Sequence, residues 1–148
     1  MAKGQRRGAA TRHAGIRLEL DEAVIALFIG AMMANGHFAP AEAARAHHLI
    51  WSTRRFRRKS GEAVGKLIED VRDLLEQHDP ERVVEIAART IPARLRPSAF
   101  AVLADLLLAD GKMDARERRF LRRTGSMLKI TPDTMRQVTE ISLLKNQL

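Results

Sequence analysis

The sequence predicts an all-α fold, in the form of a single compact bundle of about seven helices. Ala, Leu, Arg and Glu dominate the composition and favour helices, whereas Tyr is absent and β-branched residues are sparse. Apolar residues recur at spacings of three and four along the chain, and no segment shows the alternation that a strand needs. With 148 residues, 45 % of them apolar and 30 % charged, the chain suits one folded domain.

Capping residues and prolines mark where most of these helices begin. Asp21 is expected to cap the first helix, Pro40 opens the second at a first helical position, and Ser60 caps the third. The expected helices span residues 21–34, 40–58, 62–77, 80–90, 97–109, 114–128 and 131–144. Residues 1–19 are basic and lack apolar periodicity, so we expect a disordered tail there and a helical domain over residues 20–148.

The chain also carries an internal repeat. The stretch ANGHFAPAE at residues 34–42 resembles ADGKMDARE at residues 109–117, and both ends share an offset of 75 residues. The helices before the two loops align at the same offset, and each carries a stripe of mostly small residues. The stripes are Ala23, Ala26, Gly30 and Ala34 in the first helix and Ser98, Ala101, Asp105 and Ala109 in the second. Because small residues let helices approach closely, we expect these two helices to cross near a pseudo-twofold axis.

The loop of the second copy has a purely structural interpretation. Gly111 fits the left-handed position that ends many helices. Asp114 can cap the following helix, and Glu117 lies three residues further on, which is the spacing of a capping box. A helix end, a turn and a helix start therefore explain these three residues without a ligand.

Two further carboxylates in this region leave room for a cation site. Asp105 interrupts an apolar run, and a buried carboxylate is costly unless it is paired, hydrogen-bonded or bound to a metal. Asp105, Asp110 and Glu117 together can supply hard oxygen ligands for a divalent cation such as Ca²⁺ or Mg²⁺, although their spacing is not that of an EF-hand loop.

The first copy of the repeat is poorer in negative charge. At the positions of Asp105 and Asp110 it has Gly30 and Asn35, and only Glu42 keeps its charge. If the loops bind cations, the first copy should bind weakly or not at all. If the loops are only turns, Asn and Asp are nearly interchangeable there.

Basic charge is concentrated in the front of the chain. The net charge is +8; residues 1–60 carry 11 Lys and Arg against 4 Asp and Glu, whereas residues 61–148 carry 15 against 14. Such a basic half indicates a polyanionic partner, for example nucleic acid, an anionic membrane surface or an acidic protein. The alternative is a solvated basic face with a basic tail.

The densest basic segment is WSTRRFRRKSG, residues 51–61. Its five cations are Arg54, Arg55, Arg57, Arg58 and Lys59. At the end of the second expected helix they complement the helix dipole, and they can equally contact phosphates. Trp51 and Phe56 are either core anchors or available for stacking and insertion. Because no recognised nucleic-acid-reading module is present, nucleic acid is the less favoured polyanion.

Several function classes are excluded by what the sequence lacks. The absence of Cys excludes disulfides and thiolate zinc sites and is compatible with a cytoplasmic location. There is no metalloprotease His-Glu-x-x-His motif, phosphate-binding loop, dinucleotide fingerprint or Cys nucleophile, so no enzymatic activity is expected. No apolar run approaches the roughly 20 residues of a membrane-spanning helix, and acidic residues follow the basic N-terminus, so neither a span nor a secretory signal is expected.

In its repeated motif the chain resembles the TerB-like family of tellurite-resistance protein B and its relatives. The family pattern is an apolar Ala/Leu helix, then Ala-Asp-Gly, then a Glu that opens the next helix. FAVLADLLLADGKMDARERRFL at residues 100–121 matches this pattern, and ALFIGAMMANGHFAPAEAARAHHLI at residues 26–50 matches it as a degenerate copy. The resemblance can cover about residues 20–146.

The resemblance implies both a fold and a function. It implies a helical fold of two related halves and an acidic cluster for a divalent cation, formed by Asp105, Asp110 and Glu117, with Glu42 across the pseudo-twofold axis. It also implies a stress-associated, non-enzymatic adaptor that binds another protein, often at the inner face of the membrane. Two alternatives remain: a basic module that binds nucleic acid or an anionic membrane surface, and an interaction domain without a ligand.

Overall fold

The structure is a computed structural model that describes residues 15–34 and 47–148 of the chain. All regular secondary structure in these ranges is helical and there is no strand in them, which confirms the predicted all-α class. The helices are α2 (Leu20–Ala34), α4 (Gly61–Gln77), α5 (Pro80–Thr90), α6 (Arg96–Leu107), α7 (Ala115–Met127) and α8 (Pro132–Lys145), with a short 3-10 helix, η1 (Ala93–Leu95), before α6. Residues 47–52 are also helical.

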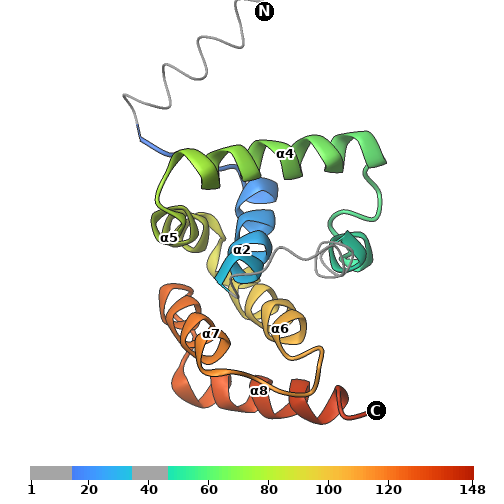
Figure 1. Cartoon of the computed structure of the whole chain (residues 1–148), viewed down its shortest axis with the longest axis vertical. Helices are drawn as coiled ribbons and strands as arrows, with labels where there is room; N and C mark the ends of the chain where they lie inside the picture. Colours follow the sequence, from blue (N-terminus) through green and yellow to red (C-terminus); the bar gives the residue numbers. More distant parts are fainter. Residues whose placement is uncertain (1–14, 35–46) are drawn as a thin grey trace, which may run out of the picture.

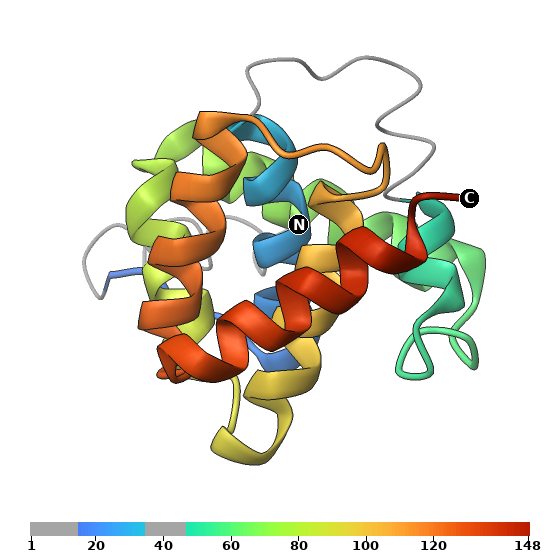
Figure 2. The same ribbon diagram turned by 90° about the horizontal axis from the view of Figure 1, so that it is seen from below.

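Helix α2 lies at the centre of the bundle and is apolar on nearly every side. Ile25, Leu27 and Phe28 are at most 1 % exposed. Helices α4, α5, α6 and α7 all contact α2, whereas α8 packs on α6. Figure 1 shows α4 across one end of the bundle and α8 across the other, and the view from below shows α8 crossing α6 (Figure 2). An apolar helix of this kind is stable only when other helices surround it.

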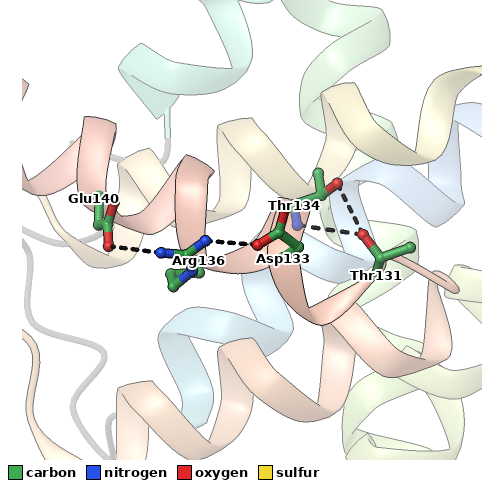
Figure 3. A network of polar contacts seen from close by, with 5 residues as sticks. All are labelled: Thr131, Asp133, Thr134, Arg136 and Glu140. Atoms are coloured by element: carbon green, nitrogen blue, oxygen red, sulfur yellow. Dashed lines mark hydrogen bonds and ion pairs between the residues drawn. The ribbon is translucent and has the colours of Figure 1, made fainter.

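Four of the predicted helix starts are confirmed by side-chain caps. Ser60, Asp79 and Asp114 each accept a backbone N–H bond at the start of α4, α5 and α7. At the start of α8, Thr131 accepts a bond from the backbone of Thr134, and ion pairs follow along the exposed face of the same helix (Figure 3).

Two of the expected boundaries differ from the structure. Asp21 does not cap α2, because the helix begins one residue earlier, and Asp21 lies in its first turn. The second expected helix ends at residue 52 rather than near Arg58, while its start lies outside the described residues. At the end of this helix the hydroxyl and the backbone N–H of Thr53 both donate to the carbonyl of Leu49, at 2.8 and 3.1 Å. Residues 53–59 then form consecutive turns, so the basic cluster does not lie on a helix C-terminus.

The predicted crossing of two small-residue stripes is not confirmed, nor is the repeat with its offset of 75 residues. The small residue Gly30 of α2 lies against α5: a Cβ atom at Gly30 would lie only 2.6 Å from Cγ2 of Val84. On α6, the stripe position Asp105 is directed to α8, where it contacts Lys145. Helices α2 and α6 are in contact, but the close approach at Gly30 is to α5 and not to the stripe of α6.

Candidate functional site

The turns at residues 53–59 form one wall of a groove of about 720 Å³. Asp21, Val24 and Phe28 of α2 and Ser98, Ala99 and Val102 of α6 line it from the other sides, together with Ile91 and Leu95. Four of the five predicted anion-binding residues also line the groove: Arg54, Arg55, Arg58 and Lys59. The groove thus combines an apolar floor with a basic edge. We call Arg54, Arg55, Arg57, Arg58 and Lys59 the basic surface.

A buried aromatic ring and two ion pairs hold the basic surface in place. Phe56 is fully buried in the core, so its predicted alternative use in stacking is wrong. Asp21 of α2 pairs with Arg55, and its other carboxylate oxygen lies 3.0 Å from Nζ of Lys59. Burial by itself raises the pKa of Asp21, but the hydrogen bonds and charges of Lys59 and Arg55 outweigh it and lower that pKa below its ordinary value.

The remaining cations of the basic surface are available to a partner. Arg54, Arg57 and Arg58 are exposed. Within residues 15–34 and 47–148, no side-chain hydrogen bond or ion pair is found for them. Among the described residues that line the groove, Asp21 is the one carboxylate, so four cations face a single negative charge there. The groove is therefore electropositive. The role of Asp21 could not be predicted from the sequence, since 34 positions separate it from Arg55.

The loop between α6 and α7 has the turn geometry that the sequence predicts. Gly111 has a φ of +71°, in the left-handed region that favours glycine. Asp114 and Glu117 form a reciprocal capping box: Asp114 accepts from the backbone N–H of Glu117 at 2.8 Å, and Glu117 accepts from that of Asp114 at 3.3 Å. The C-terminus of α8 closes the loop, because the side-chain amide of Gln147 donates to the carbonyl of Gly111 at 3.1 Å.

Asp105 is neutralised by α8. Its Oδ1 atom lies 2.7 Å from Nζ of Lys145 and accepts a hydrogen bond from Nδ2 of Asn146 at 3.0 Å. The same amide of Asn146 also donates to the carbonyl of Ser142, which fixes its orientation. An ion pair therefore accounts for the carboxylate that interrupts the apolar run of α6, and sequence reasoning did not identify Lys145 and Asn146 as the partners.

The other predicted cation ligands are only partly brought together. Asp110 lies close enough to Glu117 for its charge to affect the ionisation of Glu117. Burial first, and then the negative charges of Asp114 and Asp110, raise the pKa of Glu117 above its ordinary value. Glu42 lies outside the described residues. In the part of the chain that the structure describes, no group of three or more His, Cys, Asp or Glu is suited to hold a metal ion. The predicted set of four ligands stays a prediction.

A second group of arginines borders a smaller cavity of about 350 Å³ between α2, α5 and α7. Its charged residues are Arg116, Arg119 and Arg123, together with Glu81. Arg123 donates two hydrogen bonds to the carboxylate of Glu81, at 2.8 and 3.0 Å, and this pairing lowers the pKa of Glu81. In the described part of the chain, three cations border this cavity and Glu81 offsets one of them, so the cavity is less electropositive than the groove.

The fold and the loop define a class of protein: a small all-helical domain in which an apolar helix passes through an Ala-Asp-Gly turn into a helix opened by a capping box. The chain belongs to the TerB family. The family model described as "Tellurite resistance protein TerB" matches residues 21–140, which covers α2 from its second residue, α4 to α7 in full and most of α8. This match confirms the TerB-like resemblance that the repeated motif predicts.

Comparisons with curated proteins and with solved structures return no match to this chain. Among the helices in the described ranges, none is long and apolar enough to cross a membrane.

Proposed function

We propose that this TerB-family chain is a non-enzymatic, stress-associated adaptor domain that holds an anionic partner on its basic surface. The single observation that carries the proposal is the state of Arg54 and Arg58, which are exposed at the edge of the groove and have no ion-pair partner in the described ranges. Arginine presents a planar fork of donors suited to carboxylates and phosphates. Two such forks on one edge can therefore engage an anionic group.

The support of the basic surface favours binding over a merely solvated face. Flexible surface cations lose conformational entropy when they bind, and this loss weakens the complex. In this protein the fully buried ring of Phe56 anchors in the core the turns that carry Arg54 and Arg58. Arg54 and Arg58 project from a segment that is already ordered, so less entropy is lost on binding.

Binding to phosphatidylglycerol vesicles tests this proposal. Because the whole chain is basic, binding alone does not locate the surface. The informative variant is Arg54→Gln/Arg58→Gln. The matched control is Arg118→Gln/Arg122→Gln, because these two arginines of α7 are also exposed and have the same spacing in the sequence. We expect salt-sensitive binding that the first pair of substitutions weakens much more than the second. Equal weakening by both pairs would mean that only the net charge matters, and the proposal would fail.

A divalent cation at the loop between α6 and α7 is a second candidate function. The observation that favours it is that the negative charge of Asp110 acts on Glu117 and helps to raise its pKa, a repulsion that a bound Ca²⁺ or Mg²⁺ would relieve. Asp105 contributes less to such a site than its sequence position suggests, because Lys145 already neutralises it. The test is a melting curve with and without millimolar Ca²⁺ or Mg²⁺, since a ligand that binds only the folded state raises its stability.

Glu117→Gln is the matched variant for this second test. Gln preserves the capping box but removes the charge that a cation needs. If a cation stabilises the wild type and not this variant, the loop is a cation site. If the two proteins melt alike with and without cation, the loop is only a turn.

A further inference from the structure

The groove beside the basic surface has an apolar floor that a purely electrostatic partner does not need. The floor is made by Val24 and Phe28 of α2, by Ile91 and Leu95 before α6, and by Val102 of α6. Leu95 and Val102 are half-buried, whereas the other three are buried. Leu95 and Val102 therefore supply the exposed part of the floor, in the groove that Arg54 and Arg58 also line.

The size and lining of the groove are those of a small-molecule site. Ligand pockets typically have volumes of about 300–1,000 Å³ and mostly apolar walls, with a few polar groups that fix the orientation of the ligand. The groove has about 720 Å³ and carries its positive charge along one edge. A matching ligand has one apolar tail and one anionic head.

Macromolecular occupants fit this groove less well. A docked amphipathic helix needs several apolar anchors over two turns, but Phe28 and Ile91 are at most 1 % exposed and offer it little surface. Single-stranded nucleic acid needs aromatic faces for stacking, and the aromatic rings beside the cations are buried or packed on the core: Phe56 is fully buried and Trp51 is partly buried.

We propose that this groove binds a single-chain anionic lipid. The carboxylate or phosphate head pairs with Arg54 and Arg58, and the acyl chain lies along Leu95 and Val102. This inference rests on the proposed function, because it uses the same two arginines, and it adds the class of ligand. The excess positive charge of the groove recognises the anionic head of the lipid, and its apolar floor recognises the acyl chain.

Dodecanoate below its micellar concentration is the probe, and titration calorimetry on the whole chain is the measurement. Ser98 lines the groove and is exposed, so Ser98→Phe fills the groove without disturbing the core or the charges. Ser126→Phe, at an exposed position of α7 outside the groove, is the matched control. Dodecyl maltoside supplies the same chain with a neutral head.

We expect dodecanoate to bind with a micromolar Kd. Ser98→Phe and Arg54→Gln/Arg58→Gln should each weaken binding at least about tenfold, a change of about 1.4 kcal/mol, whereas Ser126→Phe should not. Dodecyl maltoside should bind at least about tenfold more weakly. The inference is overturned if dodecanoate does not bind, if Ser98→Phe leaves its affinity unchanged, or if the neutral detergent binds equally well. It is also overturned if dodecanoate does not bind but an acidic helical peptide does, and if Ser98→Phe abolishes the binding of that peptide.

The vesicle assay on the same proteins separates the two proposals. If dodecanoate fails to bind but vesicle binding still depends on Arg54 and Arg58, only the lipid inference is lost. If vesicle binding is also indifferent to these arginines, the proposed function fails with it.

Discussion

The Nζ atom of Lys145 lies 2.7 Å from Oδ1 of Asp105, so the last turn of α8 neutralises a carboxylate in the last turn of α6. This pair decides between the explanations for a charge within an apolar helix. An ion pair and the hydrogen bond from Asn146 are sufficient, and no cation is needed to satisfy Asp105. The remaining candidates for cation binding are the carboxylates of the loop itself.

A double-mutant cycle should detect this pairing. Asp105→Asn and Lys145→Met are each expected to lower the free energy of unfolding by less than about 1 kcal/mol, because the Lys145 side chain is 62 % exposed and water screens the pair. The double variant should lose less than the sum of the two, with a coupling of about 0.5 kcal/mol in urea unfolding. A coupling of zero would show that the pair contributes nothing in solution.

Gly111→Ala should destabilise the fold by about 2 kcal/mol, since the left-handed backbone costs a non-glycine residue about 1 kcal/mol and a clash adds to it. The new Cβ atom would lie 2.9 Å from the backbone oxygen of Asn146. Gly65→Ala is the control, because a Cβ atom there meets nothing within 4 Å on helix α4. The Gly65→Ala substitution should raise the free energy of unfolding by about 0.5–1 kcal/mol. Similar melting temperatures for the two variants would contradict the geometry of the loop.

Glu117 should make stability depend on pH in a defined direction. Its pKa is raised in the folded protein, so its contribution to stability is fully present below the unfolded pKa and is lost as pH rises through the folded pKa. Gln cannot ionise, so the Glu117→Gln variant does not lose stability as pH rises. It should be more stable than the wild type at neutral pH, by about 0.5 kcal/mol. Melting temperatures across the acidic range measure the effect. A less stable Gln variant at neutral pH would mean that the charge of Glu117 is favourable, as a bound cation would make it.

Asp21→Asn should affect stability and binding in opposite directions. The loss of ion pairs to Arg55 and Lys59 should cost about 0.5–1 kcal/mol. Because the pKa of Asp21 is lowered, this contribution is present above its unfolded pKa and disappears as pH falls through the folded pKa. The same change makes the groove more positive, so phosphatidylglycerol vesicles should bind several-fold more tightly at low salt. A variant that loses both stability and binding would indicate that Asp21 positions the cations for their ligand.

Local chemistry made much of the fold predictable. Ser60, Asp79, Asp114 and Thr131 cap their helices as expected, since capping depends on residues only two or three positions apart. The early end of the helix before residue 53 was not predicted, because the burial of Phe56 in the core is a tertiary contact that outweighs helix propensity there.

The candidate site was predictable only in part. The five cations were identified from their density in the sequence, and four of them line the groove. Their pairing with Asp21, like that of Asp105 with Lys145, joins residues 34 or more positions apart and depends on how the helices pack. The apolar floor of the groove likewise comes from three separated segments, which no local pattern brings together.

The most direct test of the central claim is a map of amide chemical shifts while the ¹⁵N-labelled chain is titrated with a heparin oligosaccharide. If the basic surface holds the anionic partner, the largest shifts will fall on residues 53–59 and on the facing residues Ser98 and Val102, and they will fade as salt is added. If the largest shifts fall instead on the arginines of α7, or spread evenly over all exposed cations, the basic surface is not the binding surface.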